Sequence, residues 1–249
     1  MIRIWTLALF LIRDLFRSLA GVIPLAVALA FGLIAFEYGM DQAQFITVGG
    51  LGIGSICLLN TLLLASRANR ASSYPLVARL HRRAELLAAL VLGGLLITAA
   101  LAIPITGGNL LLGRLTLDWP SALWILPTWL PLWLLAAALA LPLSPLAGRA
   151  GSHLVGWTLL AALLIANDQK ARLQHLRLDW LIRAVSAVLW PVNTLLAQAS
   201  ASVGQAGSGQ AAGLGRTYLL AWALTLAYAV LLFALASQLF EDKDLLWTE

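Results

Sequence analysis

Charged residues are scarce in this chain of 249 residues, since Asp, Glu, Lys and Arg together make up 11% of it. An average soluble domain has about 25% charged residues. Hydrophobic residues make up 61% and the mean hydropathy is +0.89, so the composition excludes an ordinary water-soluble domain and indicates an integral membrane protein. Cysteine occurs once, at Cys57, which excludes a disulfide within the chain.

Residues that carry catalytic or ligand chemistry are also few. The two lysines, Lys170 and Lys243, do not follow a glycine-rich turn, so the chain lacks the phosphate-binding loop of an ATPase. The three histidines, His81, His153 and His175, do not have the spacing of zinc ligands. No carboxylate lies inside a predicted span, where an ion-coupled carrier would need one. We therefore expect no catalytic site, no metal site and no cofactor in this chain, and no nucleic acid partner.

Long uncharged stretches are what the chain has instead. Crossing a hydrocarbon core of about 30 Å takes roughly 20 mostly apolar residues in a helix. Seven stretches lack Asp, Glu, Lys and Arg, but the one at 184–215 has a polar, glycine-rich second half that does not suit lipid. The sequence therefore predicts an all-α integral membrane fold, a single transmembrane domain over 1–249, with six transmembrane helices within 18–36, 42–66, 86–113, 119–148, 150–167 and 217–240.

Residues 1–18 predict an amphipathic helix that lies on the membrane surface. At 100° per residue, Arg3, Arg13 and Arg17 fall on one narrow stripe of this helix, together with Thr6 and Asp14. The rest of its surface is apolar, so this interfacial helix would bury its apolar side among lipid headgroups while the arginines meet anionic lipid. The alternative is a simple leader into the first span.

Basic residues predict the orientation, because Lys and Arg are biased toward cytoplasmic loops. They are frequent before the first span and in the segment 67–83 after the second span, whereas the turn at 37–44 has none. Both termini are therefore expected in the cytoplasm. Against the same bias, this orientation places four basic residues on the outer side, partly offset by Asp168 and Asp179: Lys170, Arg172, Arg177 and Arg183.

The spans carry several packing signals. The five prolines of the fourth span predict a kinked or broken helix with an irregular outer end. Its tryptophans are expected at the membrane interface: Trp119, Trp124, Trp129 and Trp133. In the second span, Gly50 and Gly54 predict close helix packing. Interhelical hydrogen bonds are expected from Asn60, Thr61, Asn193 and Tyr218.

Three short segments and the order of features along the whole chain resemble a known family. Ser66–Leu87 is similar to a cytoplasmic loop between spans two and three, Gln238–Leu245 follows a Phe-x-x-x-Asp-Leu pattern, and Leu189–Leu196 looks like a proline-containing outer helix before the last span. Together they resemble the permease subunit of ABC-2-type exporters. Many relatives carry an acidic residue and a Gly-Thr pair soon after the second span, where this chain has Arg67, Asn69 and Ala71-Ser72-Ser73.

The resemblance implies partners and a coupling site. The partners would be cytoplasmic ABC ATPase subunits, which bind the ATP and Mg, and a second permease copy or paralogue in a dimer. The segment 67–83 would be the cytoplasmic coupling segment, where Ser73 can cap a short helix that docks in a groove of the ATPase. The expected coupling residues are Pro75, Leu76, Val77, Arg79, Leu80, Arg82 and Arg83. The alternative is a basic loop that fixes topology on anionic lipid.

The resemblance also implies an outer gate. The outer segment 168–216 would hold re-entrant helices that dip back into the membrane before the last span, with Pro191 marking a break and Trp190 and Asn193 beside it. Irregular backbone at that depth is tolerated only where protein or a water-filled path covers it, which fits a gate at a subunit interface. The alternative is a plain outer loop with a helix lying on the surface.

The expected function is that of the transmembrane permease subunit of an ATP-driven exporter in the inner (plasma) membrane of a bacterium. The alternative from another class is a non-transporting scaffold or assembly subunit of a larger membrane complex. A secondary carrier is disfavoured because the spans hold no carboxylate. The apolar spans do not identify a substrate.

Overall fold

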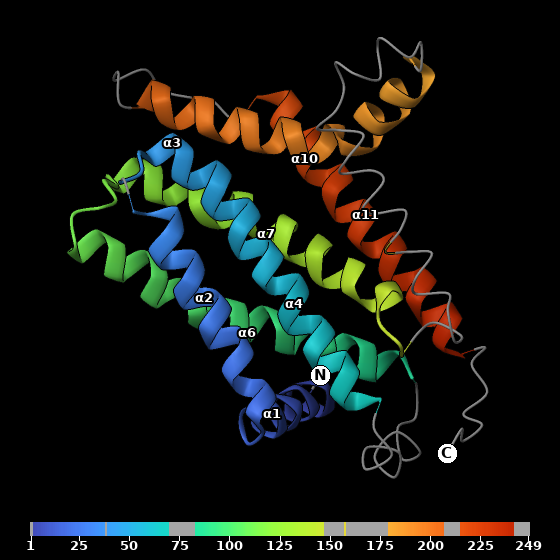
Figure 1. Cartoon of the computed structure of the whole chain (residues 1–249). Coiled ribbons are helices and arrows are strands. Elements are labelled where there is room, and N and C mark those ends of the chain that lie inside the picture. The colour runs from blue at the N-terminus through green and yellow to red at the C-terminus, as the bar shows by residue number, and fades with distance from the viewer. Residues whose placement is uncertain are drawn as a thin grey trace.

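The computed structural model describes residues 2–37, 39–69, 83–146, 157, 179–206 and 215–241. Across these residues the regular structure is helical, apart from an isolated bridge between Met40 and Leu115. The elements, labelled as in Figure 1, are α1 (Ile2–Phe16), the 3-10 turn η1 (Leu19–Gly21), α2 (Val22–Ala35), α3 (Gln42–Gln44), the π-helical turn η2 (Phe45–Gly49), α4 (Gly50–Ala68), α6 (Ala84–Leu111), α7 (Trp119–Leu143), α10 (Asp179–Ala206) and α11 (Arg216–Glu241).

Four helices in the described ranges are long and apolar enough to cross a membrane. They correspond to the second, third, fourth and last predicted spans, so the expectation of a multi-pass helical membrane protein is confirmed: Gln42–Ala68, Ala84–Leu111, Ala122–Leu143 and Arg216–Glu241. The pair of α1 and α2, bent by 97°, is a possible fifth. The predicted span at 150–167 lies outside the described residues, and the count of six stays a prediction.

The bend between α1 and α2 sets the N-terminal helix apart from the first predicted span. A Cβ on Gly21 would lie 2.7 Å from the Phe16 Cα and 2.9 Å from the Leu15 carbonyl oxygen. Glycine permits this approach because it has no side chain. The helix that follows, α2, has 14 residues, or ~21 Å at 1.5 Å per residue. By itself α2 is therefore shorter than the hydrocarbon core of about 30 Å.

The prolines of the fourth span do not break its helix. The predicted irregular outer end is wrong, because α7 continues from Trp119 to Leu143 through Pro127 and Pro131. Pro131 has no N–H to donate to the Pro127 carbonyl four residues earlier. The indole Nε1–H of Trp222 on α11 donates to that carbonyl oxygen instead, at 3.0 Å. A hydrogen bond between helices thus replaces the missing bond within the helix, as proline in a membrane span requires.

Two of the four tryptophans in α7 lie in the core. Trp129 and Trp133 are 2% and 6% exposed, so the prediction that they lie at the membrane interface is wrong. The Trp129 Nε1–H donates to the Ile46 carbonyl oxygen at 3.1 Å, and its ring meets the edge of the Phe45 ring with centroids 5.0 Å apart. Trp129 therefore fastens α7 to the π-helical turn before α4.

The two glycines predicted to pack closely behave differently. A Cβ on Gly50 would lie 2.9 Å from the Trp129 Nε1, whereas a Cβ on Gly54 would meet nothing within 4 Å. Close packing is confirmed at Gly50 and is wrong at Gly54. A single sequence shows the spacing of small residues but not which helix lies across from them.

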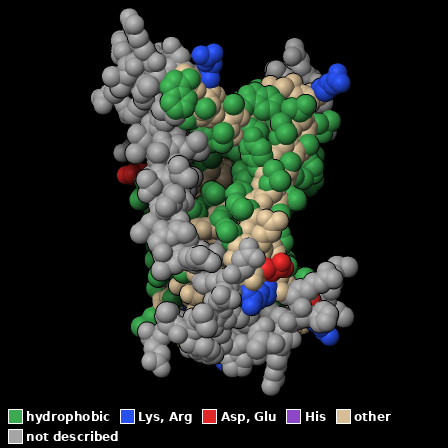
Figure 2. Space-filling view, turned by 90° about the vertical axis from the view of Figure 1, so that its right-hand side faces the viewer, with side chains coloured by type: hydrophobic (Ala, Val, Ile, Leu, Met, Phe, Trp, Pro, Cys, Tyr) green, Lys and Arg blue, Asp and Glu red, His purple; other side chains and the backbone are tan. Residues whose placement is uncertain are grey.

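The bundle has two ends, which we name by their helices (Figure 1). The α1 end holds α1, the last turns of α4 and α11 and the first turn of α6. The α10 end holds α10, α3 and the first turns of α7 and α11. Figure 2 shows basic side chains near both ends of one face and hydrophobic side chains over the described surface between them. This distribution suits a chain whose middle lies in lipid.

Candidate functional site

The predicted coupling residues lie mostly outside the described residues. Pro75, Leu76, Val77, Arg79, Leu80 and Arg82 fall in 70–82, so the structure describes Arg83 alone of this set. The two flanks of 70–82 are described, and both lie at the α1 end of the bundle. Their contacts define the candidate site.

The flank before 70–82 is tied to α1 by an ion pair. The Arg67 Nε–H, in the last turn of α4, donates to Asp14 Oδ2 at 2.7 Å. The Arg67 side chain is 13% exposed and the Asp14 side chain 46%, so the pair lies at the edge of the bundle. A charge-assisted hydrogen bond of this length is stronger than a neutral one. It joins α1 to the end of α4.

The flank after 70–82 is tied to the end of α11. The Arg83 Nη1–H group donates to the carbonyl oxygens of Phe240 at 2.8 Å and Glu241 at 3.1 Å. The Arg83 guanidinium also lies 5.7 Å from the centroid of the Phe240 ring. The last carbonyls of a helix have no partner within it, and a cation is favourable there. Arg83 therefore caps α11 at its C-terminal end.

Helix α1, which the sequence predicts to lie on the membrane surface, has two apolar sides and not one wide apolar face. One side is buried where α1 packs against α6 and α4, and comprises Leu7, Ala8, Leu11 and Leu15. The other side is 44–51% exposed and comprises Trp5, Leu9, Phe10 and Phe16. The predicted lipid-facing arginines are exposed: Arg3, Arg13 and Arg17. The predicted helix is confirmed, but one of its two apolar sides packs against α6 and α4 and is not available to lipid.

The predicted gate residues lie on α10. This helix runs through Pro191 without the predicted break, because a proline removes one helical hydrogen bond and can bend a helix without ending it. Figure 1 shows α10 changing direction along its length and lying across one end of the bundle. Pro191 is buried, whereas Trp190 is 38% exposed and Asn193 is exposed. Of the three predicted gate residues, Pro191 is therefore buried, and Trp190 and Asn193 lie on the surface.

A separate apolar cluster holds α10 on the bundle. The α10 side of this cluster is a helical face of Leu195, Leu196, Ala199 and Val203. It packs against Ile46, Leu132, Tyr218 and Ala221. Since these residues come from η2, α7 and α11, the cluster connects α10 to three elements at once.

Two of the predicted interhelical hydrogen bonds are present. The Asn60 Nδ2 on α4 donates to the Thr98 Oγ1 on α6 at 3.0 Å, and the hydroxyls of Tyr218 on α11 and Thr128 on α7 lie 3.3 Å apart. The prediction is wrong for Thr61, whose hydroxyl donates to the Cys57 carbonyl of its own helix at 2.9 Å. These bonds fix helix positions, which is a structural role.

Sequence reasoning missed the anchors of the candidate site. Asp14 and Phe240 lie near opposite ends of the chain. They have a role only because the folded bundle brings Asp14 next to Arg67 and Phe240 next to Arg83. Within the ranges that the structure describes, no group of three or more His, Cys, Asp or Glu side chains is placed to hold a metal ion.

The chain matches no protein-family model, no curated protein and no solved structure.

Proposed function

We propose that this chain is the transmembrane permease subunit of an ATP-driven exporter, which works with a separate cytoplasmic ATPase and with a second permease copy or paralogue. Two features support this. The chain is a bundle of several membrane-spanning helices, and its segment Ser66–Leu87 is similar to the cytoplasmic loop of ABC-2-type permeases. The main support is a third feature: both flanks of that segment are bonded to other helices.

Both flanks of 70–82 are held by other helices. The flank before it is bonded to α1 through Arg67 and Asp14, and the flank after it is bonded to α11 through Arg83. A force on 70–82 would therefore reach α1 and α11, which lie on different parts of the bundle, instead of bending an isolated loop. Movement of packed helices as rigid bodies is the usual way in which a local push becomes a larger conformational change.

The proposal includes six crossings with the α1 end in the cytoplasm. α7 ends toward the α1 end, whereas α10 lies across the opposite end (Figure 1), and a crossing by the predicted span 150–167 would join them. α10 would then lie on the outer side and α11 would return to the cytoplasm. The basic residues of α1 and of 67–83 would face anionic lipid and the ATPase.

The experiment is affinity purification of the full-length chain with the nucleotide-binding protein that accompanies it. Replacing Leu76 and Leu80 with Asp should abolish association while leaving insertion into the membrane intact, because charge replaces the apolar side of the docking helix. Ser72→Asp with Ser73→Asp is the matched control, since it adds the same two charges to the segment and Asp caps a helix as Ser does. The control should keep the association.

The two readouts separate the candidate functions. An exporter subunit should bring down a protein that hydrolyses ATP, and reconstitution with this chain should change its ATPase rate. Unchanged co-purification after the Leu76 and Leu80 substitutions would contradict the coupling role. Stable association with a membrane complex that contains no ATPase would favour the scaffold function instead.

A further inference from the structure

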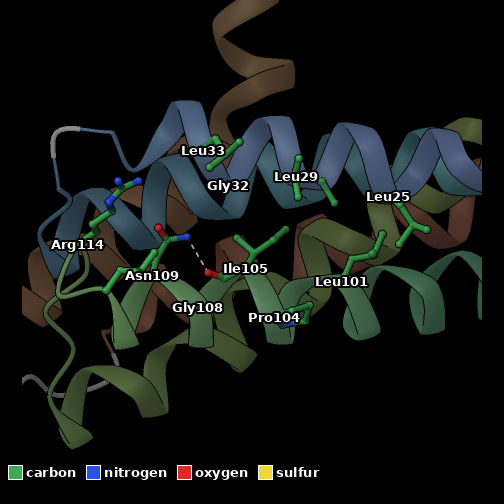
Figure 3. Close-up of a pocket in the computed structure, with 12 residues that line it drawn as sticks. Leu25, Leu29, Gly32, Leu33, Leu101, Pro104, Ile105, Gly108, Asn109 and Arg114 are labelled. Atoms are coloured by element: carbon green, nitrogen blue, oxygen red, sulfur yellow. Dashed lines mark hydrogen bonds between the residues drawn. The ribbon is translucent and has the colours of Figure 1, made fainter.

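A groove runs along the outside of the bundle between α2 and α6. It has a volume of about 290 Å³. Its walls are an apolar stripe of α2 at helical spacing, which includes Leu25, Leu29 and Leu33, and the facing side of α6, which includes Leu101 and Ile105 (Figure 3). Leu29 is 66% exposed and Leu33 is 56% exposed, so the groove is open to the surroundings of the bundle.

The groove is polar at one end only. Asn109 and Arg114 lie at the same end, and Leu25 and Leu101 lie at the other (Figure 3). The amide of Asn109 is used within α6, because its Nδ2 donates to the Ile105 carbonyl oxygen at 2.8 Å. The groove is therefore lined by apolar side chains along its length and has one cation, the Arg114 guanidinium, at one end, which we call its mouth.

Within the described part of the chain, Arg114 forms no ion pair with a carboxylate. Three carboxylates, Glu37, Asp41 and Asp118, belong to the same end of the bundle but do not line the groove. Of these, Asp41 accepts a hydrogen bond from the Gln44 N–H at 2.7 Å and caps α3. An anionic group at the mouth would be the partner that Arg114 lacks.

The length of the groove matches one leaflet of a bilayer. The segment that lines it from Leu101 to Leu112, which is the end of α6 and the residue after it, is ~18 Å long at 1.5 Å per residue. Half of a hydrocarbon core of about 30 Å is ~15 Å. The residues next to the groove are exposed and apolar, with Ile103 at 73% and Leu111 at 91%, so the groove opens onto a surface that suits hydrocarbon.

We propose that the groove binds an acyl chain of an anionic phospholipid in the leaflet at the α10 end, with the lipid phosphate on Arg114. Arginine makes paired hydrogen bonds to phosphate in a fixed geometry. Lipid tails are as apolar as leucine, so the apolar walls supply shape but little preference over bulk lipid. The preference comes from Arg114 and the net headgroup charge, because choline offsets the phosphate of phosphatidylcholine whereas the phosphate of an anionic lipid has no such cation. This site does not depend on the exporter function, because it requires only that the bundle crosses a membrane.

The test uses the full-length chain in phosphatidylcholine vesicles that contain a small fraction of phosphatidylglycerol with a photoreactive diazirine in its acyl chain. After illumination, cross-links are mapped by mass spectrometry of peptides and compared with those from phosphatidylcholine that carries the same diazirine. One arginine near a membrane surface contributes ~1 kcal/mol to attraction of anionic lipid, which corresponds to about fivefold. We expect this preference for phosphatidylglycerol in peptides from α2 and from the end of α6.

Two adjacent glycines provide a matched pair of variants. A Cβ on Gly107 or on Gly108 would meet nothing within 4 Å, so neither position excludes a side chain at its Cβ. Gly108 lines the groove and Gly107 does not. Gly108→Leu should remove most groove cross-links, and Gly107→Leu should keep them. Arg114→Gln should lower phosphatidylglycerol labelling to the level of phosphatidylcholine.

Two results would overturn the proposal. The first is labelling of the groove peptides no stronger than labelling of the exposed face of α11 around Leu231 and Leu235, which would mean ordinary surrounding lipid. The second is cross-linking of two copies of the chain through α2 with the groove shielded from lipid, which would mean that a second copy covers it.

Discussion

Replacing Trp222 with Phe should destabilise the bundle by removing one hydrogen bond between helices. The Trp222 Nε1–H donates to the Pro127 carbonyl oxygen at 3.0 Å, and Phe keeps the ring but has no donor. Interhelical hydrogen bonds in membrane proteins contribute on average ~0.6 kcal/mol and at most ~1.7 kcal/mol. Leaving a buried acceptor without a partner costs ~1–3 kcal/mol. Because this bond is exposed and not buried in the core, we expect a loss at the lower end of these ranges, ~1 kcal/mol.

The neighbouring Pro131 allows a sharper version of the measurement. Pro131→Ala introduces an N–H four residues after Pro127, in position to donate to the same carbonyl within α7. In the Pro131→Ala background that carbonyl keeps a partner, so Trp222→Phe should cost ~1 kcal/mol less than it does in the natural chain. The quantity measured is the coupling energy of this double-mutant cycle.

The assay is reversible unfolding of the purified chain in mixed detergent micelles, followed by far-ultraviolet circular dichroism so that loss of a tryptophan does not affect the signal. Trp119→Phe is the control, because Trp119 is 77% exposed and a surface change of this kind costs at most ~0.5 kcal/mol. Additive effects of Trp222→Phe and Pro131→Ala, within ~0.3 kcal/mol, would refute the idea that Trp222 replaces the helical bond.

Three other predictions test packing, anchoring and orientation. Gly50→Ala should destabilise the bundle by ~1–3 kcal/mol because Trp129 must shift, whereas Gly54→Ala should stabilise it by ~0.5–1 kcal/mol; equal effects in thermal unfolding would contradict the difference in packing. Asp14→Asn should weaken the docking of α1 by at most ~1 kcal/mol, seen as faster hydrogen exchange in α1, and exchanging the charges of Asp14 and Arg67 should restore the protection. A cysteine at Arg79 in a Cys57→Ala chain should react with an impermeant reagent only after cells are opened, and labelling of intact cells would reverse the orientation.

The long apolar helices could be predicted from the sequence because length and lack of charge are enough to identify a membrane span. Burial inside the bundle could not, because lipid and protein interiors are both apolar and hydropathy does not distinguish them. Trp129 and Trp133 show this directly, since their type suits the membrane interface and their position is the core. The bond from Trp222 to Pro127 likewise depends on which helix lies beside α7, and no local pattern contains that information.

The candidate site shows the same division between local and tertiary information. The basic residues of 67–83 can be read from the sequence alone, and they identify this segment as a candidate cytoplasmic site. The roles of Arg67 and Arg83 depend on Asp14, which is 53 residues before Arg67, and on Phe240, which is 157 residues after Arg83. Contacts between residues so far apart in sequence follow from the packing of whole helices. A single sequence therefore predicts the basic segment but not the helices to which its flanks are bonded.

Under the proposed function, α11 is the element that connects the two ends of the bundle. It has 26 residues, or ~39 Å at 1.5 Å per residue. Its last turn is capped by Arg83, and its first turns pack against α10 through Tyr218 and Ala221. Because a helix bonded along its whole length resists compression along its axis, a displacement of Arg83 would reach α10 on the far side.

The other flank leads through Asp14 to α1, and so to α6 and to the groove wall formed by α2. A push on 70–82 would thus act on two different sets of helices, and relative movement of those sets is what opening a path requires.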